Sequence, residues 1–491
     1  MKHSLFFATS FLGLFSLIAT SCFHSSAKKT IVFEEDTVSV IKNPCMGWGL
    51  YDDANDEVQN ADAYWKQQDE AARKYGSFFY VRWRWSEMEP EEGKYAWLYD
   101  ENYKKLIQGA LDRGLKLCFR IYNNSQDNVS QSTPDYVRKA GAEGYMIDGE
   151  NGKMWNPYPD DPIFQAKLNT FIEAFAKEYD NPDIVDFIDG YSIGWWGECH
   201  NIHLKSKEEN ALQKVLDQIT TIYSSHFKHV LLTLPFGSQV GFEAEHRIAI
   251  QSKGYSMRRD GLGSMWFSDS EREIVQQMYG KALFVGESCW WKSCSDSVRP
   301  WASDTRYKLE SWRDVYELTY QHAMEGHFNT LDLREIPETT GWTTRGLDLV
   351  KSFCSKGGYR IHPTSITYAS RVSRNDSLQI QHAWVNTGNG YLPNNVKNWG
   401  YKYKPVFALV DESDKIVKTF VDLQAEPSAW LTAQVHAYDF KVALKDVPAG
   451  HYRLCVAIGD KNKAWSPGIR LAIREAVEEN GWYNVGDLKI D

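Results

Sequence analysis

The chain has 491 residues, of which 24% are charged and 43% hydrophobic, and its formal net charge at pH 7 is −10. A length of this order predicts two domains, each large enough to bury a core. The net negative charge argues against nucleic acid as a partner, because phosphate backbones bind basic surfaces.

The N-terminus has the layout of a secretory signal. Lys2 and His3 precede an apolar run from Leu5 to Ile18, and small residues lead from there to Cys22. The run is too short to span a bilayer comfortably, and a basic start with a small-residue end is typical of a cleaved signal.

A cysteine directly after small residues resembles the lipobox of bacterial lipoproteins, although Ala19 stands where Leu is commoner. The resemblance implies that residues 1–21 are removed and that Cys22 is lipidated. The protein would then be anchored to a membrane of the bacterial cell envelope, on its periplasmic face or at the cell surface. Residues 22–39 would form a tether. An ordinary cleaved signal with an incidental cysteine is the alternative.

Residues 40–356 alternate short apolar segments with amphipathic ones. Eight candidate strands lie at 47–51, 78–85, 115–122, 187–195, 230–234, 256–262, 282–286 and 328–333. Helices are predicted around 100–113, 164–175 and 212–222, where apolar residues recur every three to four positions. This alternation predicts a (β/α)8 TIM barrel. A doubly wound open sheet is the alternative, but no Gly-rich phosphate loop follows the first strand.

After Gly357-Gly358 the helical periodicity stops and short alternating segments follow. Candidate strands lie at 378–385, 406–410, 416–423 and 452–458, and turn-forming clusters separate them. Residues 357–491 are therefore expected to form an antiparallel β-sandwich of the immunoglobulin-like kind, as an accessory domain. No low-complexity linker divides the two regions, so we expect the domains to pack against each other.

Two glutamates lie where a barrel carries its catalytic groups, at the C-terminal ends of strands. Glu198 follows the fourth predicted strand, and Glu287 ends the seventh. Cleavage of a glycosidic bond requires one carboxylic acid to protonate the leaving oxygen and one carboxylate to attack or to activate water. The pair therefore predicts glycoside hydrolysis.

Two further stretches carry a family resemblance. They are Asn43–Gly49, near the first strand, and Arg82–Tyr95, whose Trp85-Ser86-Glu87-Met88-Glu89-Pro90 and Gly93-Lys94-Tyr95 follow the second strand. With the two glutamates, these stretches resemble clan A glycoside hydrolases, which are retaining (β/α)8 glycosidases. The resemblance implies that Glu198 is the acid/base and Glu287 the nucleophile, with a poly- or oligosaccharide as substrate and no cofactor. The C-terminal region resembles the β-sandwich modules appended to such barrels in bacterial lipoproteins.

One position departs from the family pattern. The clan places Asn before the acid/base glutamate, where it contacts the sugar hydroxyl beside the reacting carbon, and this chain has Gly197 there. Either another group does that work, for which Asn123 and His200 are the candidates, or the barrel binds carbohydrate without cleaving it. A scaffold protein fits least well, because aromatic residues gather at the predicted strand ends.

Charged and aromatic residues near the strand ends are further candidates for sugar contacts. The arginines at these positions are Arg82, Arg84, Arg120, Arg258, Arg259 and Arg334. Of these, Arg82 and Arg120 are the expected substrate contacts, and a guanidinium fork also suits a uronate or a sulfate. The alternative is that the arginines pair internally with acids such as Asp189, Asp260 or Glu335.

Aromatic rings at the strand ends are expected to act as sugar platforms, with packing in the core as the alternative. The candidates are Trp195, Trp196, Trp290, Trp291 and Trp342. His200 and His203 can also reach substrate, but they are too few to hold a metal. The cysteines form no metal or disulfide pattern. Cys289 and Cys294 either pair with each other or stay as buried thiols.

Overall fold

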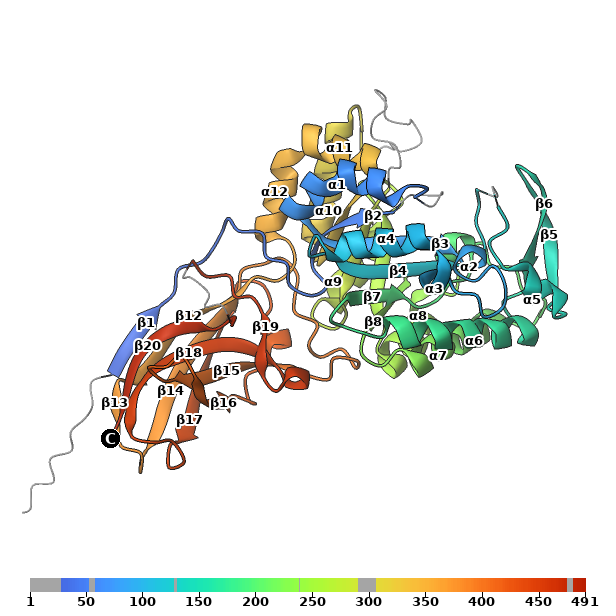
Figure 1. Ribbon diagram of the computed structural model, residues 1–491. Coiled ribbons are helices and arrows are strands. Elements are labelled where there is room, and N and C mark those ends of the chain that lie inside the picture. Colours follow the sequence, from blue (N-terminus) through green and yellow to red (C-terminus); the bar gives the residue numbers. More distant parts are fainter. Residues whose placement is uncertain (1–27, 53–57, 128–129, 238, 290–305, 475–479) are drawn as a thin grey trace, which may run out of the picture.

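The computed structural model describes residues 28–52, 58–127, 130–237, 239–289, 306–474 and 480–491 (Figure 1). The chain forms two lobes, a closed eight-stranded barrel surrounded by helices and a C-terminal lobe of two packed sheets. The barrel carries the candidate site, and the C-terminal lobe lies beside it.

The barrel strands are parallel and close in the order β10-β11-β2-β3-β4-β7-β8-β9. Their bounds are β2 (Gly47–Tyr51), β3 (Gly76–Arg84), β4 (Lys116–Tyr122), β7 (Val185–Asp189), β8 (Leu231–Pro235), β9 (Ser256–Leu262), β10 (Phe284–Ser288) and β11 (Thr330–Arg334). Thr330 of β11 pairs with Gly47 of β2, so the sheet has no free edge. The (β/α)8 prediction is confirmed, and the open-sheet alternative is wrong.

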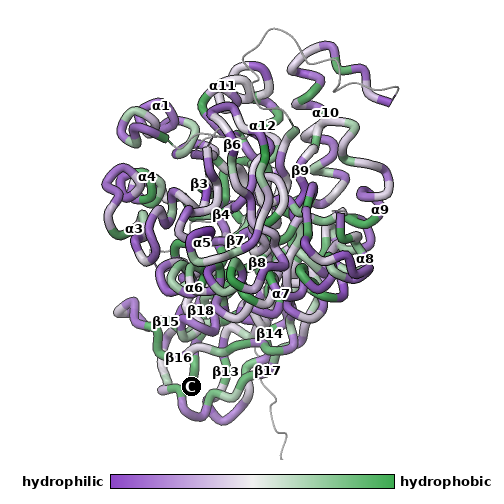
Figure 2. The backbone as a smooth tube through the Cα atoms, turned by 90° about the vertical axis from the view of Figure 1, so that its right-hand side faces the viewer, coloured by the Kyte–Doolittle hydropathy of each residue, from purple (hydrophilic) through white to green (hydrophobic). Residues whose placement is uncertain are grey.

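Helices cover the outside of the barrel. They are α1 (Ala61–Lys74), α2 (Trp85–Met88), α3 (Ala96–Tyr99), α4 (Glu101–Leu111), α5 (Asp135–Lys139), α6 (Pro162–Tyr179), α7 (Ala211–His226), α8 (Phe242–Glu245), α9 (Asp269–Met278), α10 (Trp312–Glu325), α11 (Ile336–Arg345) and α12 (Leu347–Lys356). In Figure 2 helices such as α4 and α6 alternate hydrophilic and hydrophobic segments, as expected for elements that bury one face.

Helix α6 illustrates how the sequence sets these elements. The Asp161 carboxylate accepts hydrogen bonds from the backbone N–H groups of Ile163 and Phe164, both at 2.9 Å, and Pro162 occupies the first turn. An acidic N-cap followed by proline is a favourable helix start. Phe164 and Phe171 then lie on the buried face.

An additional hairpin, which the sequence pattern did not predict, interrupts the barrel between β4 and α6. Strands β5 (Gly144–Gly149) and β6 (Gly152–Pro157) pair antiparallel. The hairpin extends beyond the rim of the barrel (Figure 1). It enlarges the loop that follows the third barrel strand, at the end of the barrel where active sites are built.

The C-terminal lobe consists of two sheets that share a hydrophobic core. One sheet contains β1 (Lys28–Val32), β12 (Ile361–Ala369), β14 (Ser377–Asn386) and β17 (Val435–Ala443). The other contains β13 (Arg371–Val372), β15 (Tyr403–Val410), β16 (Ile416–Val421), β18 (Gly450–Asp460), β19 (Ser466–Ile469) and β20 (Tyr483–Ile490). The strand pairs are antiparallel apart from β13 with β20, in agreement with the predicted sandwich.

The expected tether requires a correction. Residues 28–32, predicted to belong to an extended linker, form β1 and pair antiparallel with β12. Ile31 packs against the core of the C-terminal lobe, and the adjacent Phe33 is buried in it. These apolar side chains favour an edge strand over a solvated tether.

The two lobes share a continuous junction at the N-terminal end of the barrel. Phe78, Phe187 and Leu283 of the barrel interior belong to the same hydrophobic cluster as the core of the C-terminal lobe. The Asn398 side chain donates to the Val230 carbonyl at 2.8 Å, across the two lobes. The expected packing of the domains is therefore observed.

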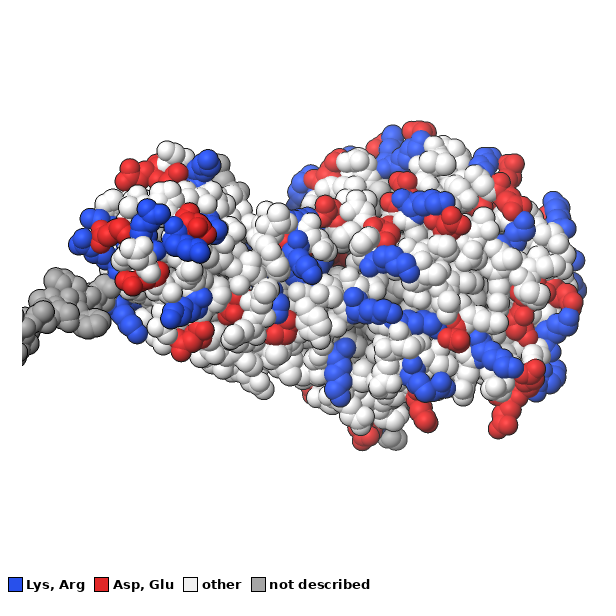
Figure 3. All heavy atoms as spheres, turned by 90° about the horizontal axis from the view of Figure 1, so that it is seen from below, with Lys and Arg blue, Asp and Glu red and all other residues white. Residues whose placement is uncertain are grey.

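The charged side chains on the face seen in Figure 3 are of both signs and are interspersed over both lobes. Among the described residues, no helix has the length and apolar character needed to cross a membrane.

Candidate active site

The two predicted catalytic glutamates are brought together at the C-terminal end of the barrel. Glu287 lies in β10, and Glu198 follows the short 3-10 turn Trp195–Gly197 after β7. The side chain of Glu198 is 4% exposed and that of Glu287 is fully buried. Two carboxyl groups at such depth require compensating charge.

Arg120 of β4 supplies that charge by joining both glutamates. One terminal nitrogen of its guanidinium lies 2.5 Å from Oε1 of Glu198, and the other lies 3.0 Å from Oε2 of Glu287. Adjacent nitrogens of one planar guanidinium place the two carboxyl oxygens within roughly 8 Å of each other. That separation is within the range in which two carboxyl groups act on a single glycosidic bond.

Asp189 at the end of β7 forms the base of this cluster. Its Oδ2 lies 3.0 Å from Nε of Arg120 and 3.1 Å from Nε of Arg258. Tyr80 and Thr233 donate hydroxyl hydrogen bonds to the same carboxylate. Burial raises the pKa of Asp189, and the neighbouring guanidinium opposes that effect.

Two more arginines contact Glu287. Arg258 of β9 forms an ion pair with its Oε2, and Arg334 of β11 lies 3.0 Å from its Oε1. Arg334 also lies 3.1 Å from a carboxylate oxygen of Glu338. Arg120, Arg258 and Arg334 are therefore paired with buried acids, while the sugar contacts expected of Arg82 and Arg120 stay a prediction.

The loop that carries Glu198 has an unusual backbone. Trp196 and Cys199 have φ angles of 51° and 60°, and Gly197 has a φ of 72°. A Cβ on Gly197 would lie 3.3 Å from Cβ of Tyr122 and 3.5 Å from Cδ of Arg120. Tyr122 and Arg120 therefore pack against the position that a side chain at residue 197 would occupy.

Three rings surround this loop. Trp195 and Trp196 are partly exposed and their centroids are 6.1 Å apart, while His200 lies 5.8 Å from Trp195 and 5.9 Å from Trp196. The Trp196 indole donates to Asp127 at 2.6 Å, which fixes its orientation. Both tryptophans lie beside Glu198, as the sequence predicted.

His200 links Glu198 to solvent. Its Nε2 lies 3.3 Å from Oε2 of Glu198, and its side chain is 41% exposed. Burial lowers the pKa of His200, but the hydrogen bond and the charge of Glu198 outweigh burial, so the net shift is upward. His203, three residues later, contacts Tyr145 instead.

Asn123 and Arg82 are buried at the same end of the barrel. Asn123 lies directly after β4, and its Nδ2 has no hydrogen-bond partner among the described residues. The substrate contact expected of Asn123 stays a prediction. Arg82 lies in β3, and its backbone N–H donates to Asp52 at 3.3 Å.

The prediction that Trp342 is a sugar platform is wrong. Trp342 lies in α11, is 1% exposed, and packs against Tyr316 at 4.3 Å and Trp48 at 5.1 Å between ring centroids. Its apolar face fits the layer between helices and barrel, where an indole buries more area than at a rim. The position after the last strand was therefore not sufficient to identify a site residue.

Several predictions fall outside the described residues. They concern Trp290, Trp291, Cys22 and Cys294. Cys289 forms no disulfide with a described cysteine, and burial raises its pKa to about 12. Within the described ranges, no group of His, Cys, Asp and Glu side chains is arranged to hold a metal ion.

Sequence reasoning missed residues that stabilise or extend the site. Tyr80 and Thr233 hold Asp189, and the Asn124 side chain donates to the Tyr145 hydroxyl at 3.4 Å. Tyr80 and Thr233 lie on barrel strands, and an inward-facing polar residue in an apolar strand was the available signal. The β5–β6 hairpin, which carries Tyr145, offered no such signal.

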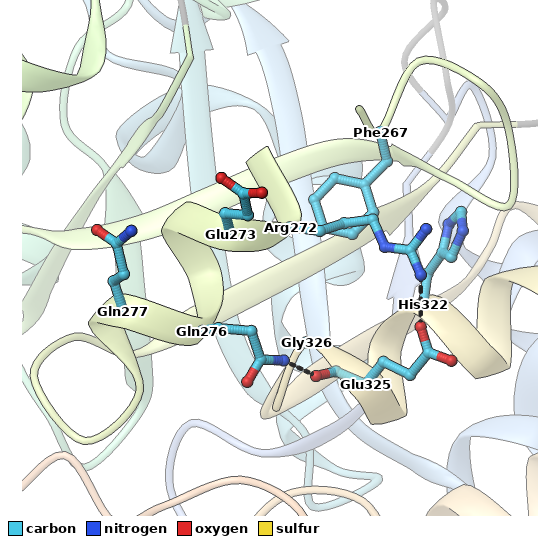
Figure 4. A pocket seen from close by; sticks show the side chains of 8 residues that line it. All are labelled: Phe267, Arg272, Glu273, Gln276, Gln277, His322, Glu325 and Gly326. Atoms are coloured by element: carbon cyan, nitrogen blue, oxygen red, sulfur yellow. Dashed lines mark hydrogen bonds and ion pairs between the residues drawn. The ribbon is translucent and has the colours of Figure 1, made fainter. Parts of the chain in front are cut away.

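Two cavities lie outside the glutamate pair. One of about 600 Å³ lies between α9 and α10, where Arg272 forms an ion pair with Glu325 at 2.6 Å (Figure 4). The other, of about 550 Å³, lies between the β5–β6 hairpin and the loop that follows Glu198. The second cavity is lined in part by the loop that follows Glu198.

Comparisons with known proteins detect only distant likenesses. No model of a known family and no curated protein sequence matches the chain. Among solved structures, endo-glycoceramidase II from Rhodococcus sp. is similar at 13% identity and a TM-score of 0.40, over 84% of this chain and 99% of that chain. An endo-1,4-β-mannanase from Rhizomucor miehei is 10% identical with a TM-score of 0.38, over 59% and 85%. Endo-β-1,4-glucanase B from Bacillus halodurans is 10% identical with a TM-score of 0.41, over 87% and 77%.

Proposed function

We propose that this protein is a retaining glycoside hydrolase in which Glu198 is the acid/base and Glu287 the nucleophile. The observation that carries the proposal is the joint contact of Arg120 with both carboxyl groups. Two acids from different strands, held by one guanidinium at the catalytic end of a (β/α)8 barrel, form the pair that glycosidic cleavage requires. The substrate class is a poly- or oligosaccharide.

In the first step a Glu287 oxygen attacks the anomeric carbon and forms a glycosyl ester. The bond from that carbon to the leaving oxygen breaks, and Glu198 transfers its proton to this oxygen. Arg120, Arg258 and Arg334 contact Glu287 and favour the ionised carboxylate that attacks.

In the second step Glu198 acts as a base. It removes a proton from water, the water oxygen bonds to the anomeric carbon, and the ester to Glu287 breaks. His200 provides the proton route, because it contacts Glu198 at 3.3 Å and is partly exposed. Two displacements at one carbon retain its configuration.

Substitution of each glutamate tests the assignment. Glu198→Gln and Glu287→Gln are each expected to lower the release of reducing sugar by about 10²-fold or more, because general acid–base or nucleophilic chemistry is lost. Glu245→Gln is the matched control, since Glu245 is also fully buried but lies in α8, where its carboxylate accepts from the backbone N–H of Gly237 at 3.0 Å. Unchanged turnover in either of the first two variants would overturn the assignment.

The stereochemical course is measured separately. Proton NMR of the first-formed product should show the anomer of the substrate. An inverted anomer would exclude the double displacement while leaving hydrolysis intact.

A carbohydrate-binding protein without hydrolysis is the second candidate. In this alternative Arg120 serves only to neutralise the two buried carboxyl groups, a role that does not require turnover. The presence of Gly197 in place of Asn supports it as well. A wild-type protein that binds glycans from a polysaccharide panel but releases no reducing sugar would establish this second function.

We also propose that the protein is exported and anchored in the bacterial cell envelope by a lipid on Cys22. The support is the signal-like N-terminus and the small residues before the cysteine. Metabolic labelling with a fatty-acid analogue should mark the wild type and leave Cys22→Ala unlabelled. Equal labelling of the two would refute the anchor.

A further inference from the structure

A cavity of about 550 Å³ lies beside the candidate active site, and nothing in the catalytic scheme above uses it. Its size is within the range of small-molecule sites. Tyr145, Tyr158, His203 and Leu204 are among the residues that line it. The Tyr145 ring lies 5.4 Å from Tyr158 and 5.0 Å from His203, between centroids.

The walls of this cavity are fixed before any ligand binds. Gln239 accepts from the backbone N–H of Ile202 at 2.8 Å. The Asp160 carboxylate accepts from the N–H groups of Lys205 and Ser206 at 3.0 and 2.7 Å. These three hydrogen bonds fix the backbone of residues 202–206, so this loop does not have to become ordered when a ligand binds.

The cavity connects to the catalytic pair through Asn124. The Asn124 side chain donates to the Tyr145 hydroxyl at 3.4 Å, and the backbone carbonyl of Asn124 accepts from the N–H of Trp196 at 2.9 Å. Trp196 lies two residues before Glu198, and His203 lies five residues after it. One loop therefore supplies both the acid/base and a wall of the cavity.

The polar groups in this wall favour a hydroxyl-rich ligand. Ser206 and Gln239 also line the cavity, which adds a hydroxyl and an amide group to its lining. Burial raises the pKa of Tyr145 to about 12, so its hydroxyl remains neutral and able to donate. Lys207, Glu208 and Glu209 line the cavity with charges of both signs, which favours a neutral ligand over a strongly charged one.

We propose that this cavity is a distal subsite of the active site. It binds a neutral sugar unit of the same oligosaccharide whose glycosidic bond is cleaved at Glu198 and Glu287. The proposal rests on the proposed function and adds that the substrate is an oligosaccharide long enough to reach the β5–β6 hairpin. The apolar faces of Tyr145 and Tyr158 suit the C–H faces of a pyranose ring, and their hydroxyl edges suit its polar rim. The hairpin thereby sets the substrate length.

Binding can be measured separately from cleavage in the Glu287→Gln background. The probes are β-1,4-linked hexasaccharides of glucose, mannose and xylose, titrated by calorimetry. At least one hexasaccharide should bind, and Tyr145→Ala should weaken its binding by about tenfold, since an aromatic contact is lost. His203→Ala, on an exposed side chain, should weaken binding in the same direction without affecting folding.

Tyr99→Ala is the matched control, because Tyr99 is 40% exposed and belongs to α3, outside the cavity. It should bind the hexasaccharide as the parent does. The proposal is overturned if none of the three probes binds, or if Tyr145→Ala and His203→Ala both bind as tightly as the parent. Binding that depends on these residues, without cleavage by the wild type, would overturn the proposed hydrolysis and leave the subsite in place.

Discussion

At the scale of single residues, Arg120 determines the character of the site. Its three nitrogens contact Asp189, Glu198 and Glu287, and its side chain is fully buried. An arginine suits this role because its planar fork serves several carboxylates at fixed angles. The ion pairs of Arg120 hold the carboxyl groups of Glu198 and Glu287 close to each other.

Loss of Arg120 should be strongly destabilising. Arg120→Met leaves three buried carboxylates with less compensating charge, and the free energy of unfolding should fall by about 3–5 kcal/mol in urea titrations. Arg313→Met is the control, because Arg313 also pairs with two acids but is 35% exposed. Its loss should cost less than about 1 kcal/mol. Equal losses in the two variants would contradict a buried network.

Gly197 is predicted to resist substitution for two separable reasons. Gly197→Ala introduces left-handed strain at a φ of 72° and places Cβ against Tyr122 and Arg120. Gly93→Ala has a similar φ of 80° but meets nothing within 4 Å. Gly93→Ala should cost about 1 kcal/mol from strain alone. Gly197→Ala should cost about 1 kcal/mol more from overpacking. Equal unfolding midpoints would show that packing adds nothing at Gly197.

At the scale of elements, loops and helices as well as barrel strands position the polar groups discussed here. The 3-10 turn Trp195–Gly197 leads into Glu198, whose carboxylate contacts Arg120 of β4, and the β5–β6 hairpin carries Tyr145. Helix α10 has a buried histidine, His322, whose Nδ1 accepts from the N–H of Gly263 at 3.2 Å. Burial, aided by the charge of Arg272, lowers the pKa of His322 to about 4.

The His322 shift predicts acid sensitivity of α10. The folded state binds fewer protons than the unfolded state between pH 6.5 and about 4, so this contribution to stability is present above pH 6.5 and is lost as pH falls. The full loss is on the order of 3 kcal/mol. The difference in unfolding free energy between wild type and His322→Gln should shrink by that amount from pH 7 to pH 4.

At the scale of the whole molecule, the C-terminal lobe closes the barrel end opposite the glutamates. Asp186 lies in β7 near this junction, and its Oδ2 accepts from the N–H of Cys45 at 2.8 Å. Burial raises the pKa of Asp186 to about 6, although the charges of Lys116 and Lys402 oppose it. Lys402 belongs to the C-terminal lobe, so a charge of this lobe affects the pKa of a carboxyl group in the barrel.

Asp186 is predicted to limit stability at neutral pH. The folded state keeps its proton up to a higher pH than the unfolded state, so stability falls as pH rises from about 4 to about 6. Asp186→Asn retains an acceptor for Cys45 and removes this loss. It should be as stable as wild type at pH 4 and more stable at pH 8, by at most about 3 kcal/mol. Thermal melts at the two pH values measure the difference, and a destabilised variant at pH 8 would contradict the prediction.

The sequence alone determined the barrel, the C-terminal sandwich and the positions of Glu198 and Glu287. Those inferences depend on local periodicity and on the rule that barrel sites lie at the ends of strands, both of which are written in neighbouring residues. The tertiary structure decided what surrounds the glutamates. Arg120 and Glu287 are 167 positions apart, and a pattern along the chain does not reveal which buried charges will pair. The same reason explains why Trp342 was misassigned and why the cavity beside the hairpin was not foreseen, because burial and shape arise only when distant elements pack.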